Sequence, residues 1–277
     1  GRLVGIPTET VYGLAGNGLN PESVRAIFAM KGRPSGHPLI LHALDPRPYA
    51  VFDERAELLS RFWPGPLTLV LPRRLGVPDE VTGGRDTVAV RCPDHPVVSS
   101  LLAQLKFPLA APSANRFGEV SPTTAQHVLA SFPDLAVLDG GACGVGVEST
   151  IVDLSRPEVS ILRPGGIPAD AISLALGLGL ADPSDTPAPG TLASHYAPRA
   201  RVLVVDDASA AAAAFGRGAR AIVRSDPPDY ARRLYAQLRA ADLPGIEVIF
   251  VEWAEPQGLG VAINDRLKRA SHRRIGE

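Results

Sequence analysis

The sequence has few cysteines. It contains two, Cys92 and Cys143, which lie far apart in the chain and form no CxxC pair. This pattern argues against a disulfide-stapled scaffold and against a cysteine-ligated zinc site. Unpaired thiols are typical of a reducing compartment, so we expect the protein to be cytoplasmic.

Net charge and aromatic side chains are also scarce. The 28 Lys and Arg residues nearly balance the 29 Asp and Glu residues, which gives a formal net charge of -1, and aromatic residues make up 5%. No overall field therefore draws the chain to RNA or to an anionic membrane, and few rings are available to stack on bases. An RNA-binding module remains an alternative function, and a weak RNA contact would have to come from a local basic patch.

Long hydrophobic runs are missing as well. Although 45% of the residues are hydrophobic, no run is long enough to span a bilayer, so we expect no membrane partner. A chain of 277 residues is long for a single core, and we expect two domains. The sequence enters at Gly1 within a strand-like run and its one methionine is Met30, so we expect a further segment before it.

Residues 3–18 form the stretch that we expect to organise the N-terminal domain. The apolar run 3–6 predicts a buried strand, and a Pro-Thr-Glu-Thr turn follows it, where hydroxyl groups and backbone amides gather. The glycines after this turn would let the backbone pass close to a bound molecule. A glycine-rich hairpin in which Thr8 and Thr10 only satisfy local turns is an equal alternative for this stretch alone.

Several polar side chains lie at or just past the ends of predicted helices and strands. The apolar patterns predict helices near 21–31, 57–63, 97–106 and after 121, and strands at 39–44, 67–71, 87–91, 109–111, 136–138, 149–154 and 159–162. The residues at the element ends are Thr10, Arg33, Arg91, Ser113, Ser149 and Arg163. Arginines at separate strand ends suit an anionic ligand that is held from several sides.

These residues also have plain structural interpretations. Lys31 and Arg33 could form a solvated helix end that the helix dipole favours, and Ser113 could cap a turn. Ser121 is interpreted as the N-cap of the following helix. The glycines of 140–146 match neither a Walker loop nor a GxGxxG fingerprint, so they predict neither of those nucleotide sites.

The sequence changes in character after residue 180. Residues 181–200 are rich in Pro, Ser, Thr and Ala, which predicts a linker, and Tyr196 within it is either docked on a domain surface or exposed. From residue 201 onward strands and helices alternate, which predicts a small parallel α/β domain. The expected strands are 202–205, 219–223 and 246–253, and the expected helices are 208–215, 230–241 and 261–270. The basic tail, interpreted as a solvated helix face rather than a nucleic-acid site, comprises Arg266, Lys268, Arg269, Arg273 and Arg274.

Six motifs together resemble a known family. They are PTETVYGLA at 7–15, KGRPSGHPLILH at 31–42, APSAN at 111–115, ESTIVD at 148–153, ILRPG at 161–165 and SHYAP at 194–198. In this order along essentially the whole chain, they resemble the two-domain threonylcarbamoyl-AMP synthases that serve tRNA threonylcarbamoyladenosine formation.

The resemblance implies an α/β fold in two domains. Its N-terminal catalytic domain, residues 1–180, would hold a large twisted mixed sheet flanked by helices. Residues 181–200 would be a linker or lid, and residues 201–277 would form a small parallel, Rossmann-like domain.

The resemblance also implies a nucleotidyltransferase, an L-threonylcarbamoyladenylate synthase. It would condense L-threonine, bicarbonate and ATP to threonylcarbamoyl-AMP and pyrophosphate, and hand the product to a tRNA threonylcarbamoyltransferase. Mg²⁺ would be carried by the ATP phosphates, with no metal ligands on the protein.

The same resemblance implies roles for individual residues. The threonine pocket would be lined by Thr10, His42, Arg91, Ala111 and Ser149. The nucleotide contacts would be Arg33, His37, Thr87, Ser113, Ser121, Arg163 and Tyr196, with Lys31 and Arg33 as the catalytic cations. The family often has asparagine at the position of His37, so the chain departs from the pattern there.

The expected chemistry needs no enzyme nucleophile. A carbamate oxygen formed on the threonine amine can attack the α-phosphorus while pyrophosphate leaves, so positioning and charge stabilisation suffice. Tyr196 is expected to fold over the nucleotide as part of a lid. A related carbamoyl-adenylate enzyme of hydrogenase maturation resembles the same N-terminal domain, but its cysteine-rich metal motifs are missing from this sequence.

Overall fold

The computed structural model describes residues 2–192 and 195–272. Its N-terminal part contains eight strands within that range: β1 (Val4–Ile6), β2 (Gly13–Asn17), β3 (Ile40–His42), β4 (Leu67–Pro72), β5 (Thr87–Arg91), β6 (Leu109–Ala110), β7 (Thr150–Asp153) and β8 (Ser160–Arg163). The helices there are α1 (Pro21–Lys31), α2 (Glu54–Leu59), α3 (Asp79–Thr82), α4 (Pro96–Gln104), α5 (Ala125–Ser131) and α6 (Ala169–Leu176), and a 3-10 turn, Ser60–Phe62, follows α2. The C-terminal part consists of β9 (Arg201–Val205), α7 (Ala208–Phe215), β10 (Ala219–Ile222), α8 (Pro227–Ala241), β11 (Val248–Glu252) and α9 (Leu259–Ser271).

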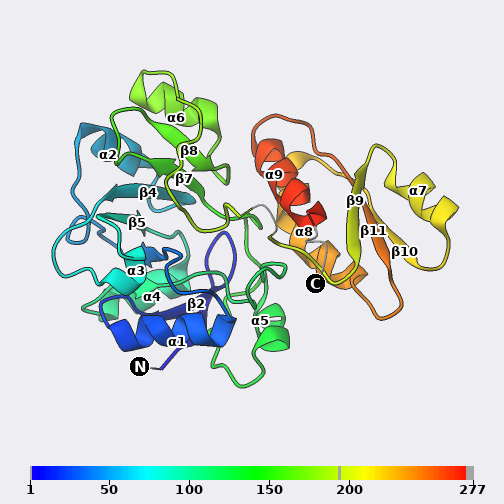
Figure 1. Cartoon of the computed structure of the whole chain (residues 1–277), viewed down its shortest axis with the longest axis horizontal. Coiled ribbons are helices and arrows are strands. Elements are labelled where there is room, and N and C mark those ends of the chain that lie inside the picture. The colour runs from blue at the N-terminus through cyan, green and yellow to red at the C-terminus, as the bar shows by residue number, and fades with distance from the viewer. Residues whose placement is uncertain (1, 193–194, 273–277) are drawn as a thin grey trace.

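These elements form two bodies, each built around its own sheet (Figure 1). The larger sheet has the order β1-β2-β6-β3-β5-β4-β7-β8 and mixes parallel with antiparallel pairs. The smaller sheet has the order β10-β11-β9, and both pairs are parallel. The predicted fold class, a large mixed sheet followed by a small parallel α/β unit, is confirmed.

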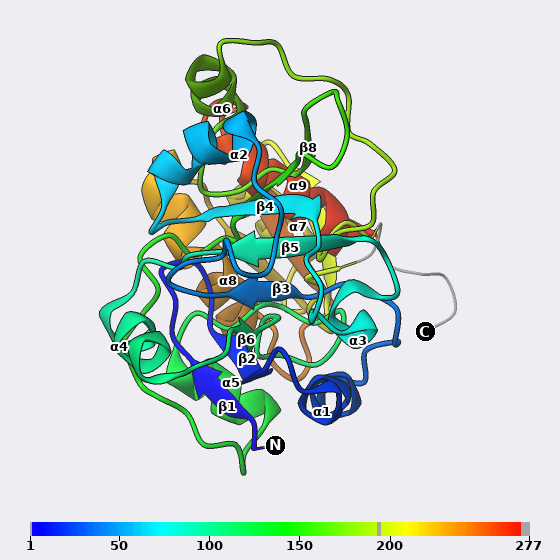
Figure 2. The same cartoon turned by 90° about the vertical axis from the view of Figure 1, so that its left-hand side faces the viewer.

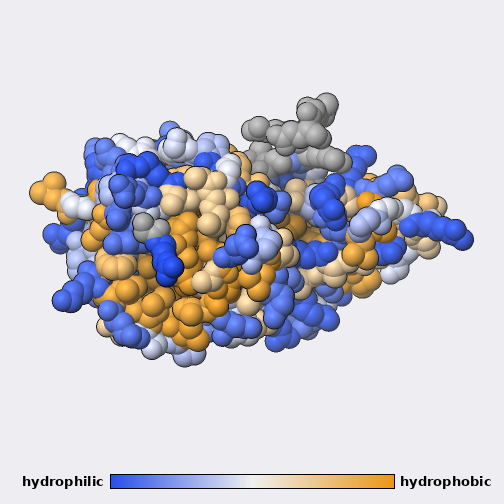
Figure 3. Space-filling model, turned by 90° about the horizontal axis from the view of Figure 1, so that it is seen from below, coloured by the Kyte–Doolittle hydropathy of each residue, from blue (hydrophilic) through white to orange (hydrophobic). Residues whose placement is uncertain are grey.

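Helices α8 and α9 lie between the small sheet and the larger body, while α7 covers the outer face of that sheet (Figure 1). Figure 2 shows the molecule turned by 90°, with the larger body toward the viewer and β4, β5 and β3 as neighbouring strands in its middle. Seen from below, apolar side chains gather on the larger body (Figure 3). No described helix is long and apolar enough to cross a bilayer.

Side-chain alternation gives the larger sheet two different faces. Leu41 and Val90 belong to the main core, where α1, α2 and α6 also bury their apolar residues. Their neighbours Ile40 and Ala89 belong to a smaller cluster with Ala188 of the predicted linker. Because side chains alternate along a strand, one face of the sheet is covered by helices and the other by residues from 181–200. The second face is the one on which the site is built.

Local signals explain most element boundaries. Asn20 caps α1 by accepting hydrogen bonds from the backbone of Glu22 and Ser23, and Gly32 ends the helix with a left-handed φ of 63°. The predicted end of this helix is confirmed. Asp53 caps α2, so that helix starts at Glu54 rather than at residue 57.

Two other predictions about local structure were wrong. The N-cap of α5 is Thr124, whose side chain accepts from the backbone of His127, and not Ser121. Residues 136–138 form no strand in the described structure, since only an isolated bridge pairs Val137 with Gly5. The sequence pattern also gave no sign of β2, α3 or α6.

Candidate active site

The second face of the larger sheet carries a small cavity of about 50 Å³, partly covered by residues of the linker. Nine residues that the sequence predicted for a site line its wall: Thr10, Arg33, His42, Arg91, Ala111, Ser113, Ser149, Arg163 and Tyr196. Strand directions explain this convergence. β5 and β3 are parallel, and β7 starts where β4 starts, next to the end of β5. The last residues of β3, β5 and β8 and the residue before β7 therefore meet at one edge of the sheet.

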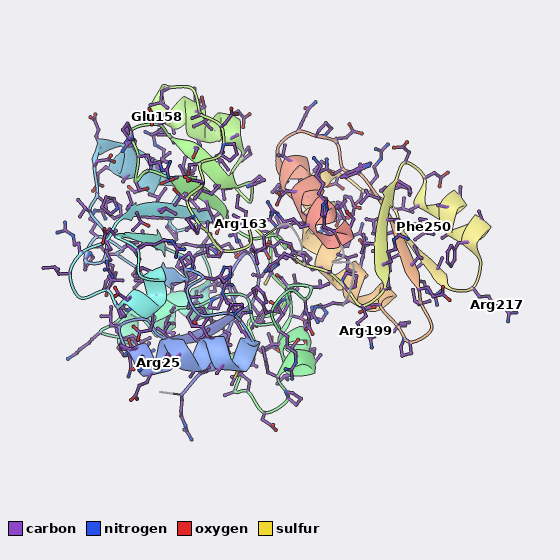
Figure 4. The ribbon with its side chains drawn as sticks, in the orientation of Figure 1. Arg25, Glu158, Arg163, Arg199, Arg217 and Phe250 are labelled. Atoms are coloured by element: carbon purple, nitrogen blue, oxygen red, sulfur yellow. The ribbon has the colours of Figure 1, made fainter. Side chains whose placement is uncertain are left out.

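Arg163, the last residue of β8, lies at the centre of this site. Its Nε and Nη2 donate to the Ser149 carbonyl oxygen at 3.1 and 2.9 Å, and Nη1 donates to the Pro189 carbonyl oxygen at 2.9 Å. Figure 4 shows Arg163 in the middle of the molecule, on the side of the larger body that faces the smaller one. The guanidinium thus joins the start of β7 to the linker, and burial lowers its pKa from the ordinary value.

Arg33 reaches the cavity from the loop after α1. Its Nη2 donates to the Pro38 carbonyl oxygen at 3.1 Å, and its Nε has no hydrogen-bond partner among the described residues. Burial, together with the charge of the nearby Arg163, lowers the pKa of Arg33 to about 10. A buried guanidinium with an unused donor is an unfavourable arrangement until an anion pairs with it.

Lys31, the last residue of α1, lies behind the wall rather than in it. Its Nζ donates to the carbonyl oxygens of Ser113 and Asn115 at 2.5 and 2.6 Å. Burial, followed by the charge of Arg33, lowers the pKa of Lys31 well below its ordinary value. Lys31 therefore ties the loop that carries Ser113 to the end of α1.

The other end of the cavity is formed by β3 and β5. Arg91 Nη2 lies 2.5 Å from Oε1 of Glu9, so the PTET turn holds this guanidinium in place. His42 pairs with Arg91 in the sheet register, and its Nδ1 lies 3.2 Å from the Ile40 carbonyl oxygen. Burial and the neighbouring Arg91 lower the pKa of His42 to about 3, so its imidazole is neutral at physiological pH.

The turn is closed by its own hydroxyl groups. The hydroxyl groups of Thr8 and Thr10 lie 2.9 Å apart, and Thr8 Oγ1 also donates to the Val11 carbonyl oxygen at 2.6 Å. The local-turn interpretation and the ligand-site interpretation of this stretch are therefore compatible, because Thr8 satisfies the local turn while Thr10 lines the cavity.

Tyr196 is docked in the site rather than exposed. It is 1% exposed, has a left-handed φ of 62°, and its hydroxyl group has no partner within the described chain. Its ring stacks on Tyr235 of α8, with centroids 5.7 Å apart. A non-glycine residue with this φ stores strain, which is typical of functional segments. Ser194, in the same motif, lies outside the described residues.

Four predicted residues are not part of the cavity wall. They are Lys31, His37, Thr87 and Ser121. His37 lies beside Phe117, with ring centroids 6.0 Å apart, and Thr87 begins β5, at the end remote from Arg91. Ser121 donates its hydroxyl hydrogen to Oε1 of Glu148 at 2.7 Å, directly behind the wall. Their roles toward a nucleotide remain predictions.

Glu148 is the main residue that the sequence reasoning missed. It lines the cavity and is 6% exposed. Burial would raise its pKa, but the charges of Arg266 and Arg163 and the hydrogen bonds that it accepts outweigh burial and lower the pKa to about 2. The signal was present in the ESTIVD motif, where a carboxylate precedes the predicted Ser149, but no partner could be identified from the sequence.

Family models and known relatives cover nearly the whole chain. The family model described as Telomere recombination matches residues 1–165, and the model of the threonylcarbamoyl-AMP synthase C-terminal domain matches residues 167–272. The chain is similar to a Pyrococcus abyssi threonylcarbamoyl-AMP synthase, with 40% identity over 99% of this chain and 92% of the relative. The chain belongs to the threonylcarbamoyl-AMP synthase family. The predicted family is thereby confirmed.

A second relative and a solved structure show the same full-length similarity. A Bacillus subtilis threonylcarbamoyl-AMP synthase is 35% identical over 99% of this chain and 90% of its own length. The crystal structure of P. abyssi Sua5 complexed with L-threonine superposes with a TM-score of 0.92 at 40% identity, covering 98% of this chain and 90% of that one. The predicted domain limits at residues 180 and 200 remain predictions.

Proposed function

We propose that the chain is an L-threonylcarbamoyladenylate synthase, a nucleotidyltransferase that condenses L-threonine, bicarbonate and ATP to threonylcarbamoyl-AMP and pyrophosphate. The observation that carries the proposal is the convergence of Thr10, Arg33, Ser149 and Arg163 from four separate segments on one buried cavity. Membership of the threonylcarbamoyl-AMP synthase family and the threonine complex of a relative support it.

The end of the cavity near β3 and β5 suits the amino acid. Arg91 can pair with a carboxylate, and Glu9 keeps its guanidinium oriented. The hydroxyl groups of Thr10 and Ser149 and the neutral imidazole of His42 can hydrogen-bond the substrate hydroxyl and amine. Ala111 completes the pocket. Polar partners of this kind reject an analogue that lacks the hydroxyl far better than an apolar pocket rejects it by size.

The end near α1 and β8 suits the nucleotide. Arg33 and Arg163 are buried cations, and Ser113 adds a hydroxyl group from the loop that Lys31 holds. These groups can neutralise the charge that develops on phosphate oxygens during nucleotidyl transfer. We propose that Mg²⁺ arrives with the ATP phosphates and neutralises part of their charge.

The reaction needs only these two halves in contact. The threonine amine nitrogen bonds to the carbon of bicarbonate while a C–O bond breaks and water leaves, which gives a carbamate. A carbamate oxygen then bonds to the α-phosphorus, and the bond between the α-phosphorus and the bridging oxygen breaks to release pyrophosphate. The protein positions the reactants and stabilises charge, and no side chain forms a covalent bond.

The linker must move for ATP to enter. A cavity of about 50 Å³ holds little more than one or two water molecules, whereas ligand pockets occupy roughly 300–1,000 Å³. Tyr196 fills the space above Arg163, so we propose that this residue and its neighbours form a lid that closes over the nucleotide. The change Tyr196→Ala should weaken ATP binding and lower the adenylate yield. An unchanged ATP affinity and yield would contradict the lid hypothesis.

A substrate-omission experiment tests the proposal. The protein is incubated with ATP, Mg²⁺, bicarbonate and L-threonine, each omitted in turn, while pyrophosphate release is followed. Release should require all of them, and the threonylcarbamoyl-AMP formed should be consumed by a tRNA threonylcarbamoyltransferase supplied with tRNA. Release that does not depend on threonine would overturn the assignment. RNA binding with a steep salt dependence and no turnover would instead favour the RNA-binding alternative.

A further inference from the structure

The basic face of α9 is not solvated as predicted. Arg266 is 1% exposed and Arg269 is half-buried, whereas Lys268 on the same helix is exposed. Arg273 and Arg274 lie outside the described residues. The prediction failed because helix spacing places residues 266 and 269 on the face that packs against the larger body, where the sequence showed no partner for them.

Arg266 meets a single buried carboxylate of the larger body. Its Nε donates to Glu148 Oε2 at 2.7 Å, and the Tyr235 hydroxyl group of α8 donates to the same oxygen at 2.8 Å. Ser121 donates to the other oxygen, Oε1, at 2.7 Å. Both oxygens of Glu148 are therefore engaged, and two of the three donors come from the smaller body.

The same guanidinium reaches two further parts of the site. Its Nη2 donates at 3.0 Å to the carbonyl oxygen of Pro164, the residue that follows Arg163. Its Cζ lies 5.2 Å from the centroid of the Tyr196 ring. Arg266 thus contacts the wall carboxylate, the backbone next to Arg163 and the lid aromatic at once.

A second arginine of α9 holds the linker. Arg269 Nη1 donates to the Leu192 carbonyl oxygen at 2.6 Å, and the Arg269 carbonyl oxygen accepts from the His195 backbone at 3.3 Å. Asp265 orients this side chain through Nη2 at 2.9 Å. One helix therefore carries the contacts to both the wall and the lid.

We propose that Arg266 is a positioning residue for nucleotide binding, through which the C-terminal body holds Glu148, the Arg163 backbone and Tyr196 in their site geometry. No lining residue of the cavity comes from residues 201–272, so the smaller body acts on the site only through such contacts. The inference rests on the proposed function and assigns to the C-terminal body a part in the reaction of that same site.

The geometry predicts which substrate is affected. Arg266 acts at the Arg163 and Tyr196 end of the cavity, whereas the threonine end is built by β3, β5 and the PTET turn. Loss of the guanidinium should therefore raise the KM for ATP about 10-fold or more and change the KM for threonine less than 3-fold. A merely structural bridge would lower the amount of folded enzyme and leave both KM values unchanged.

The test compares full-length variants in the pyrophosphate assay. Arg266→Met removes the charge, Arg266→Lys retains it but cannot reach Glu148 and Pro164 together, and Tyr235→Phe removes one hydrogen bond without leaving a buried charge unpaired. Lys268→Met, on the exposed side of the same helix, is the matched control. We expect the ATP effect to be largest for Arg266→Met, smaller for Arg266→Lys and Tyr235→Phe, and absent from the control.

A readout without turnover separates this inference from the proposed function. In the Arg266→Met protein, amide hydrogen exchange at His195 and Ala197 should accelerate at least 10-fold, while exchange in β4 and β5 stays as in the parent. If the Arg266→Met protein does not fold, the same exchange rates are compared between the Tyr235→Phe protein and the parent. Unchanged linker exchange, or equal effects on both KM values, would overturn the positioning role. If the parent protein releases no pyrophosphate, but linker exchange is still faster in Arg266→Met than in the parent, only the proposed function is overturned.

Discussion

Arg163 donates hydrogen bonds to two oxygens of Ser149: its Nη2 lies 2.9 Å from the carbonyl oxygen and 3.1 Å from Oγ. The first residue ends β8 and the second precedes β7. In the proposed function, Arg163 binds the nucleotide and Ser149 binds the amino acid. The hydrogen bonds between them therefore connect the two halves of the site, where the carbamate must meet the α-phosphorus.

Removing these hydrogen bonds should lower the rate of the reaction more than it lowers the stability of the fold. We expect Arg163→Ala to lower kcat/KM for ATP by about 100-fold, roughly 2.7 kcal/mol, because a buried charge-assisted donor is lost. The kcat/KM of Arg163→Lys for ATP should also stay well below that of the parent, because an ammonium group cannot donate to Ser149 and Pro189 with the planar geometry of a guanidinium. Steady-state pyrophosphate kinetics measure the effect. Arg156, an exposed arginine, supplies the control Arg156→Ala, and equal losses in both variants would contradict the prediction.

Closure of the lid should depend on Gly190. This residue has a φ of 76°, and a Cβ added to it would lie 2.1 Å from the Tyr196 hydroxyl oxygen. We expect Gly190→Ala to displace Tyr196 and to weaken ATP binding, as measured by calorimetry. Gly179 offers a matched control, because a Cβ there meets no atom within 4 Å. ATP affinity that is the same in the Gly190→Ala and Gly179→Ala proteins would show that Tyr196 does not close over the nucleotide.

Stability should fall in mild acid because of buried histidines. Burial lowers the pKa of His42 and His195 to about 3, with Arg91 contributing for His42. The ordinary value is 6.5, so below that pH the unfolded chain binds protons that the folded chain excludes. The folded state is therefore favoured fully above pH 6.5 and loses about 3 kcal/mol per pH unit between roughly pH 6 and 4.

Urea unfolding at pH 7.5, 6 and 5 measures this slope. The changes His42→Asn and His195→Asn should each lower this slope by about 1.4 kcal/mol per pH unit, because each deletes one of the protons that the folded chain excludes. A parent protein that is equally stable at pH 7.5 and 5 would show that the imidazoles are not held neutral by the fold.

The two thiols should be unreactive in the native protein. Burial raises the pKa of Cys143 to about 12 and also raises that of Cys92, so the thiolate form is rare at neutral pH. We expect a thiol reagent at pH 8 to modify neither cysteine before unfolding and both in urea. Rapid labelling of the native protein would contradict the packing of these side chains.

Several features were predictable from local sequence patterns. Pro21 and Gly32 marked both ends of α1, and alternation along 87–91 identified β5 with Arg91 at its end. The motifs at Thr10, Arg33, Ser149 and Arg163 indicated the residues that line the cavity. These predictions succeeded because caps, turns and alternation depend on neighbours within a few residues.

Other features depend on residues that are distant in the chain. Glu148 needs Tyr235 and Arg266, which follow it by 87 and 118 residues, and Arg239 reaches the Ser121 carbonyl oxygen across the two bodies. Ser121 looked like a helix cap because its true partner, Glu148, could not be inferred from local spacing. The basic pattern of α9 looked solvated for the same reason.

The sequence by itself determined the family, the two kinds of sheet and the polar residues available at the strand ends, since these follow from motifs and from the period of the apolar residues. Tertiary structure alone decided that the linker covers the face of the larger sheet that carries the cavity, and that α8 and α9 bring Tyr235 and Arg266 against Glu148. The physical reason is that burial of charge depends on packing between distant segments, and a lone buried carboxylate is stable only when such segments bring its donors to it.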